Sequence, residues 1–410
     1  MTLSTLPIST PQKNLAAVLF LTVLLTACGG GSDSSSNTNA PSPNPPAIEP
    51  NAQPNDNTSD NSSDNSSDNV DDQPDSITAT NEVKAALIAN NKFSLARTIC
   101  GLSGLSVDTA LDNVAIKHAN YIKYVFANSS PTVFSAHYEN NIADISGVTS
   151  NNNPFFGGLS FTDRLSNANY PNVRYGVTEN IAQSIHYSSA GNLIRSDVVA
   201  GSMAKSLLAA PYHLRSLMMP SASVTGTGVV VYKPYNKEAT NNQGYVLVNH
   251  AAATQATKDN TVKGVFTYPC EGVTDTVTAL YNETPDPVKH TGRDLRVDPI
   301  GQPIYINMPS AQTIDISNVT FHDIQRNINV PIELLDYRQD PYKNTANALP
   351  ANEAFILPIT DNLKSCQIAS KKDKNCGLHG NSDYRVSFDI LVDNRTIERE
   401  SFTFTTGIVN

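Results

Sequence analysis

Apolar residues recur at helical spacing in two neighbouring stretches near residue 100. The first stretch begins near Asn81 and ends at Gly101. Its apolar positions are Val83, Leu87, Ile88, Phe93 and Leu95. The second begins at Ser106 or Asp108, either of which can cap a helix. Its apolar face is formed by Leu111, Val114, Ala115, His118, Ile122 and Val125. The pattern predicts two helices, and on an apolar face His118 is more typical of a hydrogen-bonded core residue than of a ligand.

Further along, the pattern changes from helices to strands. Two more helices are predicted at Phe161–Ala168 and at about Asn192–Ala209, the second ended by Pro211. The second of these is expected to bury Leu193, Val198, Val199, Met203 and Leu207. Three strands are predicted at Thr227–Tyr232, Tyr245–Ala251 and Val262–Tyr268. Helices followed by meandering strands indicate an α+β domain over residues 81–268.

The chain after residue 268 has the pattern of an all-β domain. Short strands separated by turns are predicted at Pro303–Met308, Ile314–Phe321, Val330–Asp336, Ala354–Pro358, Tyr384–Val392 and Glu400–Thr406. In the fifth of these, Tyr384, Val386, Phe388 and Ile390 alternate with polar residues and share one face. We therefore expect a β-sandwich over residues 269–410, acting as a carbohydrate- or protein-binding module, or as a rigid spacer or packing partner.

Residues 1–28 have the features of an export signal. Lys13 supplies a positive charge, and Leu15 to Leu25 form an apolar stretch that is too short to span a bilayer. The stretch ends in LTAC at Cys28, which resembles the bacterial lipoprotein signal. The resemblance implies lipidation of Cys28 and anchoring to the cell envelope, and Gly29 favours the outer membrane. A plain signal peptide with an incidental cysteine is the alternative.

Residues 29–80 predict a disordered tether. They are rich in Gly, Ser, Asn, Asp and Pro, and they contain nine acidic residues and no Lys or Arg. The net charge of the whole chain is −10, so the tether carries most of it and the remaining chain is nearly neutral. A balance of this kind argues against binding to nucleic acid. Calcium binding by the Asp repeat is a weak alternative to a simple spacer, because nothing fixes the ligands in space.

Four cysteines follow the signal: Cys100, Cys270, Cys366 and Cys376. An even number in an exported chain suggests two disulfides, and three pairings are possible. Cys366 with Cys376 closes a short Lys-rich loop and is favoured, which leaves Cys100 with Cys270. Neither CxxC nor Cys/His spacing supports a zinc site made by these residues.

Several motifs in residues 81–268 resemble the CAP superfamily, also called SCP-like, in the order that the family shows. The segment ARTICGLSGLSVDTALDNVAIKHANYI resembles its first two helices, and GTGVVV places Gly226 and Gly228 at the start of a central strand. SAHYEN, VTENIA and LLAAPYHLRSLMMP place His137, Glu179 and His213 at the cavity positions. The resemblance implies an α-β-α sandwich with a central antiparallel sheet, and for residues 269–410 an Ig-like domain that ends in FTFTTG.

The sequence also departs from the family pattern. Thr178 replaces a glycine, Leu207 a tryptophan and Ala210 a serine. The second glutamate of the family's two-His, two-Glu set has no clear counterpart. Glu139, two residues after His137, is a candidate because alternate side chains of an extended segment share a face.

Two imidazoles and a carboxylate facing one cleft could bind a divalent metal such as zinc, act as acid and base, or form a structural network. No activated nucleophile or cofactor fingerprint is present. The remaining histidines are assigned surface or structural roles: His186, His250, His290, His322 and His379. The leading hypothesis is an envelope protein that binds a small ligand, a lipid or a metal. The alternatives are a peptidase-like hydrolase acting on envelope peptide or polysaccharide, and a non-catalytic adhesion or scaffolding protein.

Overall fold

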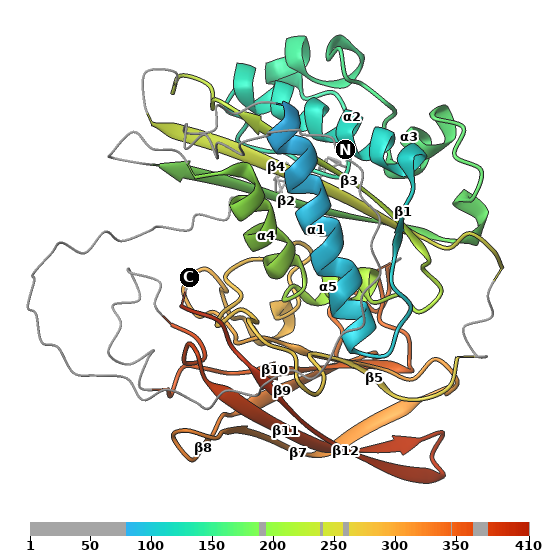
Figure 1. Ribbon diagram of the computed structural model, residues 1–410, viewed down its shortest axis with the longest axis vertical. Coiled ribbons are helices and arrows are strands. Elements are labelled where there is room, and N and C mark those ends of the chain that lie inside the picture. The colour runs from blue at the N-terminus through green and yellow to red at the C-terminus, as the bar shows by residue number, and fades with distance from the viewer. Residues whose placement is uncertain are drawn as a thin grey trace, which may run out of the picture. The chain divides into compact units, whose positions relative to one another are not determined.

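The computed structural model describes residues 79–187, 194–237, 241–256, 262–345, 347–363 and 376–409 (Figure 1). The signal, Cys28, the tether and Cys366 lie outside these residues, so the expectations for them stay predictions. The described residues fall in one compact unit. Among the described residues, no helix is both long enough and apolar enough to cross a membrane.

The first half of the chain is an α+β region built on one four-stranded sheet. Its strands are β1 (Ser106–Val107), β2 (Val177–Tyr187), β3 (Val224–Tyr232) and β4 (Asn242–Ala252), in the order β1-β3-β4-β2. Its helices are α1 (Ala79–Ile99), α2 (Thr109–Asn128), α3 (Phe161–Asn167), α4 (Ser196–Leu207) and α5 (Pro211–Leu217). The short β1 is parallel to β3, and the other pairs are antiparallel.

Helices cover both faces of this sheet (Figure 1). Val230 and Val246 pack with α2 on one face, whereas Val229 and Leu247 pack with α1, α4 and α5 on the other. Successive strand residues point to opposite faces, so the strands are apolar on both sides. The result is the three-layer α-β-α arrangement that the sequence led us to expect.

The second helix is explained in detail by its sequence. Asp108 caps α2, since its Oδ1 accepts hydrogen bonds from the backbone N–H groups of Ala110 and Leu111. The helix lies directly on β3 at Gly226 and Gly228. A Cβ added at Gly226 would lie 2.3 Å from backbone atoms of α2, and one at Gly228 would lie 2.5 Å away. The two glycines are therefore required by the close approach of helix and strand.

The prediction for α4 was wrong at one residue, and α1 buries a face that its larger apolar residues mostly do not form. In α1 the large apolar residues Val83, Leu87 and Leu95 are 52–69% exposed, and the buried face is built mainly from small residues. The buried apolar residues are Ala85, Ala89, Phe93 and Ala96. Small residues suit this face because α1 packs closely on α4, where Gly201 faces Ile88. In α4, Val198 is 57% exposed, although Val199, Met203 and Leu207 are buried as expected. Leu193 lies outside the described residues.

Pro211 follows the end of α4 and also begins a helix that the sequence analysis missed. Proline is well suited to the first turn of a helix, because its missing N–H has no partner there in any case. It opens α5, which carries His213.

The second half of the chain is mostly β, as predicted, and forms two four-stranded sheets. One has the order β5-β6-β10-β9, and the other has the order β12-β11-β7-β8. The first contains β5 (Phe266–Tyr268), β6 (Ile304–Asn307), β10 (Glu353–Pro358) and β9 (Ile332–Asp336). The second contains β12 (Thr396–Thr405), β11 (Asp383–Val392), β7 (Ile314–Asp323) and β8 (Ile328–Asn329). The alternation predicted for β11 is confirmed, because Tyr384, Val386, Phe388 and Ile390 are all buried.

The two halves share one hydrophobic core. Buried residues of α1, α4 and α5 belong to the same cluster as those of both β-rich sheets. The third strand predicted for the first half, β5, pairs with β6 and not with the α-β-α sheet. The boundary at residue 268 remains a prediction.

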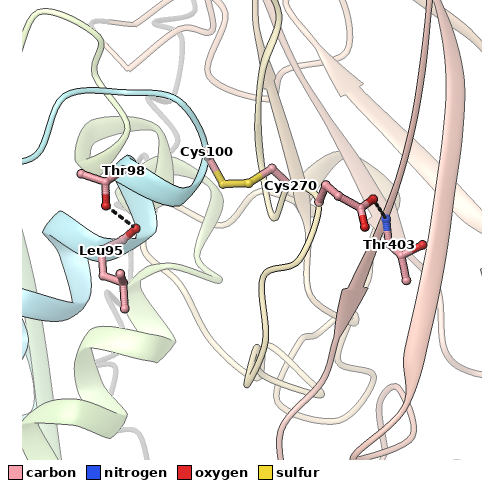
Figure 2. Close-up of a disulfide and its surroundings, with 6 residues drawn as sticks. Leu95, Thr98, Cys100, Cys270 and Thr403 are labelled. Carbon is pink, nitrogen blue, oxygen red and sulfur yellow. Dashed lines mark hydrogen bonds between the residues drawn. A yellow bond between two sulfur atoms is a disulfide. The ribbon is translucent and has the colours of Figure 1, made fainter. Parts of the chain in front are cut away.

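A disulfide joins the two halves. Cys100, just after α1, is bonded to Cys270, just after β5, with their Cα atoms 5.6 Å apart (Figure 2). One of the three pairings left open by the sequence is therefore present. Cys376 is also disulfide-bonded, whereas Cys366 lies outside the described residues.

We expect Gly226→Ala to lower the free energy of unfolding by about 1–3 kcal/mol, because the added methyl group meets the backbone of α2. Urea denaturation followed by circular dichroism measures the change. Gly147→Ala is the matched control, since a Cβ there meets nothing within 4 Å. Equal stability of the two variants would contradict the close packing of α2 on β3.

We expect Cys100→Ser combined with Cys270→Ser to lower the free energy of unfolding by about 2–5 kcal/mol, since the bond closes a long loop in the unfolded chain. Denaturant unfolding of the variant and the wild type under oxidising conditions measures the difference. A variant that unfolds at the wild-type denaturant concentration would show that the bond contributes nothing to stability.

Candidate functional site

Glu179 is a buried carboxylate at the centre of the candidate site. It lies on β2, an edge strand of the first sheet, directly opposite His250 on β4. Its Oε1 accepts a hydrogen bond from His137 Nδ1 at 3.0 Å, and its Oε2 accepts one from His250 Nε2 at 3.2 Å. The structure thus brings together two predicted site residues. It adds His250, which had been assigned a surface or structural role and is completely buried here.

Arg164 holds this carboxylate and the backbone of His137 at once. It lies on α3, whose first turn is fixed by a reciprocal capping box between Ser160 and Asp163. Its Nη2 donates to both oxygens of Glu179, at 2.8 and 2.7 Å. Both of its Nη atoms also donate to the carbonyl oxygen of His137, at 3.2 and 3.3 Å. Because the guanidinium is planar and buried, it leaves little freedom to either partner.

The surroundings of Glu179 keep it ionised. Burial alone raises the pKa of this carboxyl, because it removes water from the charge. The charge of His118, hydrogen bonds from two other imidazoles and the charge of Arg164 outweigh that effect and hold the pKa well below its usual 4.5. Burial lowers the pKa of His250, so this ring is neutral and donates through Nε2. Its Nδ1 is buried without a hydrogen-bond partner among the described residues.

Glu139, the candidate for the missing carboxylate, lies in a separate buried pair. Its Oε1 is 2.7 Å from His118 Nδ1, and its Oε2 accepts the backbone N–H groups of Gly157 and Gly158. His118 Nε2 is 2.7 Å from the carbonyl oxygen of Ala136. Both ring nitrogens of His118 therefore have hydrogen-bond partners within the core. His118 is therefore the satisfied core histidine expected from its position, and among the described contacts Glu139 bonds neither His137 nor His213.

His213 obtains its carboxylate from the other half of the chain. Glu283 Oε1 lies 3.1 Å from His213 Nδ1 and also accepts the backbone N–H groups of Tyr212 and His213, at 2.8 and 3.3 Å. The Glu283 side chain is fully buried. Burial raises the pKa of Glu283, and the contacts with His213 offset part of that rise. The sequence analysis missed this residue, which lies within the junction that follows Cys270, just before Pro285, and 70 residues after His213.

Arg97 binds the opposite end of the helix that carries His213. Its guanidinium donates to the carbonyl oxygens of Leu217, Met219 and Ala222, at 2.8–2.9 Å. Its Nε donates to Ser103. Arg97 is completely buried, and burial lowers its pKa to about 10. The short helix α5 is thus held by a carboxylate at its N-terminus and by a guanidinium at its C-terminus.

The imidazoles of His137 and His213 lie next to each other. Their ring centroids are 6.4 Å apart, and the rings are inclined by 25°. Each ring binds a buried carboxylate through Nδ1, and among the described residues neither Nε2 has a hydrogen-bond partner. No group of three or more His, Cys, Asp or Glu side chains in the described part of the chain is arranged to hold a metal ion. The site therefore offers two imidazole nitrogens, and any further ligands must come from water or from a bound molecule.

The other histidines have partners elsewhere in the fold, as expected of structural residues. They bond as follows: His186 to Ser184, His290 to Glu333, His322 to Asn329 and His379 to Asp323.

No protein-family model matches the chain, and no curated protein matches it. Among solved structures, the chain is similar to an extracellular protein containing a SCP domain from Bacillus anthracis str. Ames, with 18% sequence identity and a TM-score of 0.25. The match covers 42% of this chain and 41% of that chain, so less than half of either protein is aligned. A likeness with this TM-score is too slight to carry an argument about fold or function.

We expect Glu179→Gln to weaken the pH dependence of the free energy of unfolding below neutral pH. Because the pKa of Glu179 is lower in the folded chain than its unfolded value of 4.5, ionised Glu179 stabilises the fold above that pH. This contribution is lost as the pH falls through the folded pKa. Denaturant unfolding between pH 7 and about pH 3 measures the dependence.

The exposed carboxylate Asp144 provides the control for this measurement. Asp144→Asn is expected to keep the wild-type pH dependence. If Glu179→Gln also keeps the wild-type pH dependence, the buried partners do not stabilise the charge of Glu179.

Proposed function

We propose that the chain is an exported, lipid-anchored envelope protein whose His137–His213 pair binds a divalent metal such as zinc. The observation that carries this proposal is that each imidazole donates Nδ1–H to a buried carboxylate. In metal sites this second contact fixes the tautomer and the orientation of a ligating histidine, and it leaves the lone pair of Nε2 for the metal.

The pair supplies two of the three protein ligands that an open zinc site usually has. Imidazole nitrogen is a preferred ligand of zinc, and sites that keep exchangeable positions have fewer protein ligands than closed structural sites. A bound divalent metal would polarise a carbonyl or phosphoryl oxygen, or lower the pKa of a bound water. The protein's own part is to hold the two rings and to exclude alternative tautomers, which Glu179 and Glu283 do through Nδ1.

Export and anchoring belong to the same proposal. The Cys100–Cys270 disulfide fits an oxidising compartment outside the cytoplasm. Anchoring through a lipid on Cys28, with residues 29–80 as the tether, rests on the sequence alone. The ligand presented to the site would be a small molecule, a lipid, a peptide or a polysaccharide of the envelope, and nucleic acid is not expected as a partner.

Isothermal titration with zinc tests the proposal. We expect the wild-type chain to bind zinc and His137→Ala/His213→Ala to lose detectable binding, because both nitrogen ligands are removed. His322→Ala is the matched control, since this histidine bonds Asn329 in a β-rich sheet, away from the pair. Equal zinc binding by the wild type and the double variant would exclude this site.

A further inference from the structure

We infer that Glu283 is the positioning residue of His213, so that the β-rich half of the chain is a working part of the site. The functional role of this contact rests on the proposed function, a metal site at His137 and His213. The structural content of the inference, the control of one imidazole by one distant carboxylate, can be measured without any metal.

The helix that carries His213 lacks a cap of its own. Its N-cap residue is Ala210, which has no side-chain acceptor, so the first backbone N–H groups of α5 need a partner from elsewhere. Glu283 Oε1 takes the N–H groups of Tyr212 and His213 together with His213 Nδ1. One oxygen atom therefore fixes the start of the helix and the side chain of its third residue.

The same contact determines which ring nitrogen of His213 carries the proton. An ionised carboxylate only accepts hydrogen bonds, so Nδ1 must donate to it. The result is the same if Glu283 is protonated. Oε1 already accepts two backbone N–H groups, and Oε2 is buried without a hydrogen-bond partner, so a proton would lie on Oε2. In either state Nδ1 carries hydrogen and Nε2 presents its lone pair.

Glu283 is itself held in place by the β-rich half. The segment that leads to it begins at Cys270, which is bonded to Cys100. It then pairs with β12 through Thr276, whose N–H donates to Thr405 O, and Leu280 N–H donates to Ile300 O. The carboxylate thus reaches His213 from a segment with fixed main-chain partners, which is what precise positioning of a ligand requires.

Two measurements on the full chain test the inference. Long-range 15N–1H NMR of histidine reports the tautomer of His213, and titration reports zinc affinity. In Glu283→Ala we expect His213 to change from the Nδ1–H form to a mixture with the Nε2–H form. We also expect zinc affinity to fall about 10- to 100-fold, the usual effect of losing an outer partner of a metal-binding histidine. Glu283→Gln should retain most of both properties, because its amide oxygen can still accept.

Glu353→Ala is the matched control. Glu353 is another buried acid of the β-rich half, and it binds Arg215 on the same helix at 2.6 Å without bonding His213 in the described contacts. It should leave the His213 tautomer unchanged. Equal effects of Glu353→Ala and Glu283→Ala would overturn the inference, because they would show only a loosened helix. An unchanged tautomer in Glu283→Ala would overturn it as well.

The two proposals fail separately. A wild-type chain that binds no zinc, but whose His213 tautomer responds to Glu283→Ala, rejects the metal site and retains the positioning role. If Glu283→Ala does not fold, Glu283→Asp replaces it. That variant keeps the charge but withdraws the oxygen by one methylene, so the tautomer of His213 should still change. A wild-type tautomer in Glu283→Asp would then reject the inference.

Discussion

The site depends on a seven-residue helix that is held at both ends by opposite charges from distant parts of the chain. A helix this short is not stable by itself, because each end leaves several backbone groups without partners. At the N-terminus of α5, Glu283 accepts the free N–H groups, and at the C-terminus Arg97 donates to the free carbonyls. The signs of both charges also suit the helix dipole. The place of His213 is therefore set by residues before and after the α-β-α sheet, as well as by the packing of its own helix.

Buried charged groups also fix the position of His137. Two buried acid–base pairs are present, Glu179 with Arg164 and Glu139 with His118. Removing such groups from water costs several kcal/mol per ion, and the attraction between partners offsets this only when the hydrogen bonds are nearly complete. Both carboxylate oxygens of Glu179 accept hydrogen bonds from buried side chains. Glu139 accepts the backbone N–H groups of Gly157 and Gly158, which precede α3. The result of this arrangement is a fixed geometry at His137.

Local patterns were sufficient to predict most of the elements. Alternation identified β11, and helical spacing with an Asp cap identified α2, because in both cases the signal lies within one element. His137 and Glu179 came from resemblance to a family, and their contact follows from the first sheet and the loop beside it. Glu283 could not be found in this way. Its role arises from a contact across 70 residues and has no periodicity, and only the missing cap at Ala210 hints that a partner is needed.

The exposed apolar residues of α1 illustrate a second limit. Val83 and Leu87 are among the larger apolar residues of this helix, yet they are exposed, and the buried face uses mainly alanines. The distance between α1 and α4 determines which side chains are buried, because the close approach leaves room only for small ones. Hydrophobicity indicates which residues can be buried, whereas interhelical distance selects among them.

The Cys100–Cys270 bond has a topological consequence. It converts residues 100–270 into a covalent ring that contains α2, α3, α4, α5 and the whole first sheet. His137, Glu179 and His213 all lie inside the ring, whereas Arg97 and Glu283 lie on the two chain segments that leave it. These two segments are fastened together at the bond and then hold opposite ends of the same short helix. A single backbone cut anywhere within the ring would therefore leave the two residues that hold α5 joined to each other.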